Sequence, residues 1–296
     1  MSGAQSIKRM INSAENLKSI VGTMKAYASS NIVQFQTAAK SSMEYNEIIN
    51  MSLYIALSNE KERKIPSGAV KEKGSLYIVF GSDHGLAGRF NENISAFAEN
   101  IINADNKENN KVIIIGQQVF SRLQDMKEIT KSYNAPQSVE AITESVLDLL
   151  FNIEEYRENI DKITLIYNMP GEQSSFKEKK EILHPVDFEE IASKIGKWDS
   201  NSLPIILIDK ELLLSELLKQ YFFISLYRTF CYSLASENAS RLASMQSAEK
   251  NIDERLEDLL AQYRRRRQND ITEELNDVIS GFKAIKKFKD KKRVNY

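Results

Sequence analysis

The chain has 296 residues, of which 42% are hydrophobic and 27% are charged, and its 40 basic residues nearly balance 41 acidic ones. This composition excludes wholesale disorder, and the net charge of -1 gives no reason to expect nucleic acid as the main partner. One cysteine, Cys231, excludes an internal disulfide and favours a reducing compartment, and with two histidines it disfavours a zinc site.

The prolines predict the domain organisation. All five lie between Pro66 and Pro204, and a proline costs about 3 kcal/mol inside a helix, so the two flanking arms favour long helices. We expect an N-terminal coiled-coil helix over 1–57, an α/β base domain over 70–209, and a C-terminal coiled-coil helix with a basic tail over 210–296. No apolar run is long enough for a transmembrane helix, which predicts a soluble intracellular protein.

The N-terminal arm carries apolar or small residues at alternating spacings of three and four, which is typical of a coiled-coil seam. These residues are Ile7, Met10, Ala14, Leu17, Val21, Met24 and Ala28. The C-terminal arm has a similar stripe from Leu226 to Phe282, and a helix of about 75 residues would span roughly 110 Å. We expect the arms to pair antiparallel, with the far end of the longer one bare or covered by another protein.

The middle of the chain alternates short β-rich runs with helical patterns, which predicts a mainly parallel, Rossmann-like sheet with helices on its faces. The expected strands are 75–80, 112–115, 163–167 and 204–208, and the expected helices are 91–103, 117–125 and 138–151. The segment 170–180 is predicted to be a turn or loop. The fold class is therefore α/β, with a long antiparallel helical coiled coil and a central mainly parallel-sheet domain.

A glycine-rich segment, GSDHGLAGRFN over 81–91, directly follows the first expected strand. That position can hold phosphate, but the spacing matches neither a P-loop nor G-x-G-x-x-G. A tight turn is the favoured interpretation, and a contact surface for another subunit stays open. Adjacent residues such as Asp83 and His84 rarely act on one substrate atom, which disfavours catalysis here.

Four consecutive arginines, 264–267, lie within the C-terminal arm. They are interpreted either as a solvated face with salt bridges from Glu257 and Asp258, or as a cationic collar for an acidic protein. Residues 58–209 carry 18 basic and 25 acidic residues, a net charge of -7, so the two arms together are cationic. A cationic pair of arms suits an acidic protein sleeve.

Three blocks of sequence resemble the gamma subunit of F-type rotary ATP synthases. They are IKRMINSAENLKSIVGTMKAYASSNI, GSDHGLAGRFNENI and LASENASRLASMQSAEKNIDERLEDLLAQYRRRRQNDITEELNDVISGF, and they occur in the family's order over nearly the whole chain. Leu17, Val21 and the stretch NIVQFQ are more similar to the alternate, N-type branch. Asn31 replaces the family's usual lysine, and His84 and Ala87 stand where Arg and Cys are common.

The resemblance implies a central-stalk rotor that couples proton or sodium translocation through the membrane sector to ATP synthesis or hydrolysis in a catalytic ring. It implies one copy per complex, with alpha and beta subunits, an epsilon subunit and a membrane c-ring as partners, on the cytoplasmic side of an energy-transducing membrane as a peripheral protein. It implies no catalytic residue, metal or cofactor in this chain. Partner contacts carry over to Met24, Lys25, Ser82, Asp83, Gly85, Leu86, Gly88, Arg267, Gln268 and Thr272.

The alternative hypothesis is a small-molecule-binding α/β enzyme whose arms serve only for oligomerisation. It would place its site in residues 70–209, around the glycine-rich segment 81–88.

Overall fold

The computed structural model describes residues 3–58, 73–105, 107, 109–171, 176–189, 191, 204 and 206–294, with side chains as far as Lys283. Contacts divide the chain into two compact units. The α/β unit comprises residues 26–244, and the arm unit comprises the residues up to Lys25 together with those from Met245 onward. Each unit is described by itself.

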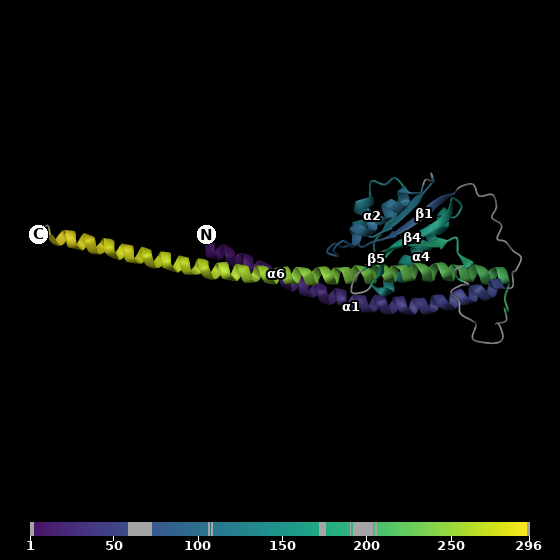
Figure 1. Ribbon diagram of the computed structural model, residues 1–296, viewed down its shortest axis with the longest axis horizontal. Helices are drawn as coiled ribbons and strands as arrows, with labels where there is room; N and C mark the ends of the chain where they lie inside the picture. Colours follow the sequence, from purple (N-terminus) through teal and green to yellow (C-terminus); the bar gives the residue numbers. More distant parts are fainter. Residues whose placement is uncertain are drawn as a thin grey trace. The chain divides into compact units, whose positions relative to one another are not determined.

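The order of elements confirms a mixed region between two long helices (Figure 1). The helices are α1 (Gly3–Ser58), α2 (Phe90–Asn103), α3 (Gln117–Leu123), α4 (Val139–Tyr156) and α6 (Lys210–Val294). The strands are β1 (Gly74–Phe80), β2 (Lys111–Ile115), β3 (Ile129–Tyr133), β4 (Ile160–Pro170) and β5 (Phe176–His184). Both long helices contribute residues to both units.

The sheet of the α/β unit has the strand order β3-β2-β1-β4-β5. The pairs β1–β2, β1–β4 and β2–β3 are parallel, whereas β5 joins β4 antiparallel at the edge. The prediction of a mainly parallel sheet is therefore confirmed. Parallel neighbours place the carboxyl ends of β1 and β2 at the same edge, and the glycine-rich segment begins there.

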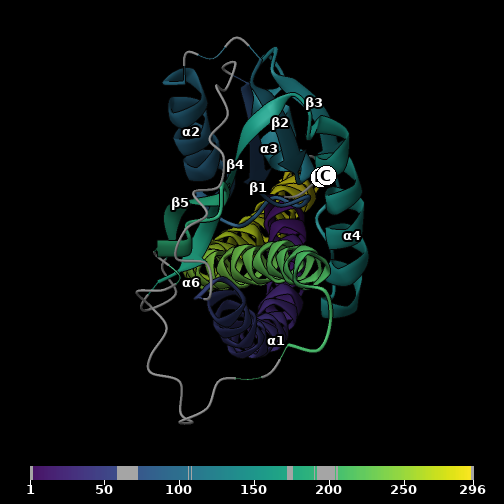
Figure 2. The same ribbon diagram turned by 90° about the vertical axis from the view of Figure 1, so that its right-hand side faces the viewer.

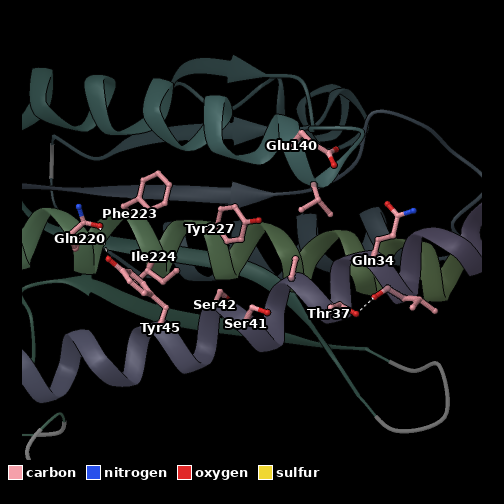
Figure 3. A pocket seen from close by; sticks show the side chains of 13 residues that line it. Gln34, Thr37, Ser41, Ser42, Tyr45, Glu140, Gln220, Phe223, Ile224 and Tyr227 are labelled. Carbon is pink, nitrogen blue, oxygen red and sulfur yellow. Dashed lines mark hydrogen bonds between the residues drawn. The ribbon is translucent and has the colours of Figure 1, made fainter.

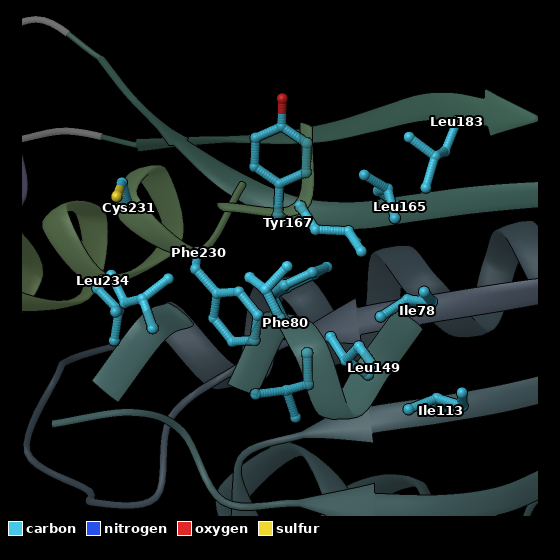
Figure 4. Close-up of a cluster of buried hydrophobic side chains, with 14 of the residues drawn as sticks. Ile78, Phe80, Ile113, Leu149, Leu165, Tyr167, Leu183, Phe230, Cys231 and Leu234 are labelled. Carbon is cyan, nitrogen blue, oxygen red and sulfur yellow. The ribbon is translucent and has the colours of Figure 1, made fainter. Parts of the chain in front are cut away.

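Alternate residues of the central strands point to opposite faces of the sheet. On one face Ile78 and Phe80 pack with α4 and with the α6 residues Leu226 and Phe230 (Figure 4). On the other face Val79 packs against α2 and α3. Because both faces are covered, β1 reads as a continuous apolar run rather than an alternating one.

Within the α/β unit, α6 lies between the sheet and α1 (Figure 2). The Tyr45 hydroxyl donates to Gln220 at 3.2 Å, and the Tyr232 hydroxyl contacts the Met43 sulfur at 2.9 Å, so the two helices run antiparallel here. The α1 seam residue Phe35 reaches the core shared by α6 and the sheet.

The seam of α1 follows a seven-residue repeat, as expected for a coiled coil. Its buried members at that spacing are Val21, Ala28, Phe35, Ser42 and Ile49. Towards the N-terminus the seam passes through Ile11 rather than through Met10 and Leu17, which are exposed. The predicted stripe was wrong at these two positions, because the side chain that α1 buries on this turn is that of Ile11.

The arm unit is an antiparallel pairing of the first turns of α1 with the later part of α6. Lys18 forms an ion pair with Asp253 at 2.6 Å, and Gly3 lies beside the Arg266 side chain. From Ile271 to Lys283 every side chain of α6 is exposed. No described helix is both long and apolar enough to cross a membrane.

Two local predictions were wrong. The described residues of 204–208 include no strand, and Leu207 is 90% exposed there, while residue 205 lies outside the described part. The predicted loop 170–180 instead contains the start of β5, although residues 172–175 lie outside the described part. Lysines and glutamates on β5 concealed the strand, because an edge strand keeps a charged outer face.

Candidate partner-contact sites

The glycine-rich segment forms a loop between β1 and α2, here named the β1–α2 loop and comprising residues 81–89. Ser82 is fully buried at its start, and its backbone N–H donates to the Asn91 side-chain oxygen at 3.1 Å. The Asn91 side-chain amide donates in turn to the Ser82 hydroxyl at 2.8 Å. These bonds tie the start of the loop to the first turn of α2.

Asp83 anchors the same loop to the carboxyl edge of the sheet. Its carboxylate accepts from the backbone N–H of Gln117 at 3.1 Å and of Ala135 at 3.0 Å. These two amides follow β2 and β3, so one side chain joins the loop to two neighbouring strand ends. The Asp83 side chain therefore holds the loop by bonding to backbone amides of other segments. The neighbouring His84 is exposed to solvent.

Helix α6 holds the other side of the loop through loop backbone atoms. The Ser240 hydroxyl donates to the Ala87 carbonyl at 2.6 Å, and Arg241 donates to the His84 carbonyl at 3.4 Å. Gly88 has φ +57°, and a Cβ there would lie 2.8 Å from the Ser244 hydroxyl. Glycine at this position therefore satisfies both a left-handed backbone and a close approach to α6.

Arg241 is itself buried, and its charge is paired. It forms an ion pair with Glu237, one turn earlier on α6, at 2.6 Å, and both residues are only 6% exposed. Burial raises the pKa of Glu237, and the neighbouring Arg241 charge opposes that shift. A buried ion pair is tolerated only with a partner of good geometry, so the two charges depend on each other.

The tip of the β1–α2 loop is the part that reaches solvent. Gly85 and Leu86 are exposed, and the Leu86 backbone has φ +62°, a conformation that non-glycine residues seldom adopt. Leu86 is 62% exposed, so an apolar side chain is presented outward from an anchored loop. Of the five residues predicted here, Gly85, Leu86 and Gly88 are exposed, Asp83 is half-buried and Ser82 is buried.

The other predicted contacts lie in the arm unit. Arg267, Gln268 and Thr272 are all exposed, and the Thr272 hydroxyl donates to the Gln268 carbonyl at 2.9 Å. Within the arginine run, Arg266 pairs with Asp270 at 3.0 Å rather than with the expected Glu257 or Asp258. The remaining predicted residues, Met24 and Lys25, are half-buried on α1, and Lys25 pairs with Glu249 of α6.

Beyond Arg267, α6 presents an exposed apolar stripe, here named the tip stripe. It consists of Ile271, Leu275, Val278 and Phe282, which recur every three or four residues and therefore share one helix face. Such a stripe on one helix is typical of a surface that another protein covers.

A groove with a volume of about 870 Å³ lies in the α/β unit between α1, α4 and α6 (Figure 3). Val33, Tyr45, Phe223 and Tyr227 supply its apolar walls, and Glu140 is its acidic group. None of its lining residues comes from the β1–α2 loop, where the alternative enzyme would have its site.

Two further observations concern metal binding and the single cysteine. No group of three His, Cys, Asp or Glu side chains that could hold a metal occurs among the described residues. Burial raises the pKa of the Cys231 thiol to about 12, which keeps it protonated and unreactive at neutral pH.

Sequence patterns did not single out Glu237, Ser240 and Arg241. Their signal was present, because they place polar side chains between Leu234 and Leu242, two residues of the apolar stripe of this helix. A glutamate four residues before an arginine also marks an ion pair on one helix face.

The chain is similar to known ATP synthase proteins along almost its whole length. Its sequence matches the family described as ATP synthase over residues 3–285. An ATP synthase gamma chain from Clostridium acetobutylicum is 29% identical, with 95% of this chain and 97% of the relative covered. One from Geotalea daltonii is also 29% identical, covering 97% of this chain and all of the relative.

Solved structures have a similar fold. A chain of the Euglena gracilis mitochondrial ATP synthase, in a structure of its OSCP, F1 and c-ring, aligns with a TM-score of 0.61 at 14% identity, covering 95% of this chain and 94% of that one. A chain of the Tetrahymena thermophila mitochondrial ATP synthase central stalk and c-ring aligns with a TM-score of 0.58 at 20% identity, covering 77% and 99%. Because its sequence matches this family over residues 3–285, the chain belongs to the ATP synthase family.

Proposed function

We propose that this chain is the gamma subunit of an F-type ATP synthase, the central-stalk rotor that couples ion flow through the membrane sector to ATP synthesis or hydrolysis. Full-length relatives carry the name ATP synthase gamma chain, and the fold is similar to chains of ATP synthase rotors. As a rotor it is a non-catalytic subunit, and the nucleotide chemistry belongs to its partners.

The observation that carries the proposal is the exposed far end of α6. From Ile271 to Lys283 the helix buries no side chain, yet it carries the apolar tip stripe. Apolar side chains on an isolated helix gain stability when another protein removes them from water. A surrounding ring of alpha and beta subunits would supply that cover.

The predicted contacts divide into two groups under this proposal. Arg267, Gln268 and Thr272 would meet the ring directly, because their side chains are exposed and an arginine can bind a carboxylate with two bonds. Met24 and Lys25 would lie beside the same ring. In the β1–α2 loop, Gly85, Leu86 and Gly88 would touch a partner, while Ser82 and Asp83 would shape the loop.

The proposed partners are alpha and beta subunits, an epsilon subunit and a membrane c-ring, with one copy of this chain per complex at the cytoplasmic face of the membrane. A tagged chain, purified from detergent-solubilised membranes, should bring down these subunits. Mass measurement of the intact complex should then give one copy of the chain. Two copies in each complex would contradict the rotor assignment.

The decisive experiment is reconstitution. The purified chain alone should not hydrolyse ATP, and adding it to alpha and beta subunits from the same source should yield an active ATPase in which it rotates. ATP hydrolysis by the isolated chain would overturn the proposal. It would favour the alternative enzyme, whose expected site around residues 81–88 supplies no lining residue to the groove.

A further inference from the structure

Arg241 connects two parts of the α/β unit that lie far apart in the sequence, helix α6 and the β1–α2 loop. It is on α6, it bonds to Glu237 of the same helix, and it donates to the His84 carbonyl of the β1–α2 loop. The neighbouring Ser240 makes the corresponding bond to the Ala87 carbonyl. Two successive residues of one helix thus hold the loop backbone on either side of its exposed tip.

These contacts are made to backbone atoms, so they fix the path of the loop whatever side chains it carries. Asp83 fixes the opposite side by accepting from the amides of Gln117 and Ala135. The tip residue Leu86 keeps its positive φ between these two sets of anchors. A strained residue persists where its surroundings determine its conformation, which is the case here.

The burial of Glu237 and Arg241 needs an explanation other than stability. Apolar residues of similar volume can replace a buried ion pair without loss of stability, so such a pair is weak evidence for a stabilising role. The guanidinium has five donors in a fixed fork, and that geometry allows Arg241 to bond Glu237 and a loop carbonyl together. An apolar residue could fill the space but could not hold the loop.

We propose that Arg241, oriented by Glu237, is a positioning residue that locks the β1–α2 loop to α6, so that the Leu86 tip moves with the helix as one body. The inference rests on the proposed function, in which this tip touches a partner while α6 turns. A rotor needs each contact to keep a fixed angle to its shaft, because a loose loop would absorb part of the motion.

The first test measures the loop directly in the full chain. Spin labels at Leu86→Cys and Leu212→Cys are both at exposed positions of the α/β unit, and buried Cys231 stays unlabelled. Pulsed electron resonance then gives the distribution of distances between the loop tip and α6. In the variant Glu237→Met with Arg241→Met, we expect this distribution to become at least twice as wide.

The double variant is used because Arg241→Ala alone would leave the buried Glu237 unpaired and would endanger folding. Circular dichroism and the urea unfolding midpoint check that the double variant is folded. Arg89→Ala is the control, since it also removes a paired arginine, but one that lies in the loop itself and pairs with Glu92 in solvent. The control should leave the width unchanged.

An unchanged width in a folded double variant would overturn the inference, because Ser240 and Asp83 would then hold the loop unaided. A second arm tests the proposed contact separately. In the reconstituted complex, Leu86→Ser should lower the rate of ATP-driven rotation at least threefold if the tip of the β1–α2 loop contacts a partner. Normal rotation of Leu86→Ser would count against that contact and would leave the result on loop position standing.

Discussion

Two stretches of the same helix are treated in opposite ways by the rest of the molecule. Between Ile224 and Met245, α6 buries most of its side chains, including serines, a glutamate and an arginine. Between Ile271 and Lys283 it buries none, although that stretch contains five large apolar residues. The comparison teaches that burial here depends on which neighbours the chain itself supplies, and that polarity alone does not predict it.

The two stretches of α6 also differ in the role of their side chains. Buried polar groups in the first stretch bond to the β1–α2 loop, so they specify one arrangement of the α/β unit. The apolar side chains of the second stretch are exposed in the described chain, so only another protein could bury them.

The largest effect on stability is expected in the buried stretch. Phe230 is buried and meets Phe80 edge to face, with ring centroids 5.0 Å apart. Phe230→Ala should lower the free energy of unfolding by about 3–5 kcal/mol, because it removes a large side chain and leaves a cavity. Urea unfolding of the full chain measures the change.

The matched control for that variant is Phe282→Ala in the exposed stretch. Phe282 is 73% exposed, so the same chemical change should alter unfolding by less than about 0.5 kcal/mol. Similar losses from the two variants would mean that the tip stripe is buried in the free chain, and the comparison would fail.

An intermediate effect is expected at the contact between α6 and β5. Glu181 accepts from Tyr167 at 2.7 Å and pairs with Arg228 of α6. Burial raises the pKa of Glu181, but Arg228, Tyr167 and Lys179 outweigh it, and the net result is a lowered pKa. Glu181→Gln should cost about 1–3 kcal/mol at neutral pH, because Arg228 loses its charged partner.

The same variant predicts a pH dependence. A carboxylate with a lowered folded-state pKa stabilises the native chain above its ordinary pKa of 4.5 and loses that contribution as the pH falls through the folded-state value. Between neutral pH and pH values below 4.5, the thermal unfolding temperature should therefore fall more steeply in the wild type than in Glu181→Gln. Equal slopes would show that the pair contributes nothing below neutral pH.

A smaller loss is expected from Gly88→Ala, where the loop meets the buried stretch. The left-handed backbone alone should cost about 1–2 kcal/mol for alanine, and the Ser244 hydroxyl must also move. Gly85→Ala is the control, because a Cβ at Gly85 meets no atom within 4 Å and its φ is not positive. Equal losses from the two alanines would contradict the close contact with α6.

The smallest effect on stability, with an effect on function, is expected in the exposed stretch. Arg267→Ala with Gln268→Ala should leave the unfolding midpoint of the free chain unchanged, because both side chains are exposed. In the reconstituted complex it should weaken assembly or coupling more than Arg264→Ala does. Equal effects would mean that the arginine run acts as diffuse charge.

Much of the fold could be predicted from the sequence, because its signals come from burial within the chain. The strands β1, β2 and β4 are apolar runs covered on both faces, and they were found. The edge strands β3 and β5 were missed, because polar residues interrupt the apolar run of β3 and lysines and glutamates interrupt that of β5. Apolar residues near Leu207 imitated a strand because composition alone does not reveal exposure.

The candidate sites could be predicted less well. The sequence indicated where the β1–α2 loop lies. It did not indicate that the Asp83 carboxylate accepts hydrogen bonds from two backbone amides of distant segments. The roles of Ser240 and Arg241 depend on the angle at which α6 passes the loop, and no local pattern encodes that angle. The exposed far end of α6 was better predicted, because it follows from the unequal lengths of the two arms.

Edge strand β5 affects whether free chains associate with one another before assembly. A free sheet edge invites another strand to add to it, and Lys177 and Lys180 are exposed on this one. Adding a strand from a second copy would bring like charges together. Like charges on this edge therefore oppose intermolecular sheet formation by free chains, and the tip stripe lies on a helix, whose backbone N–H and C=O groups bond within the helix.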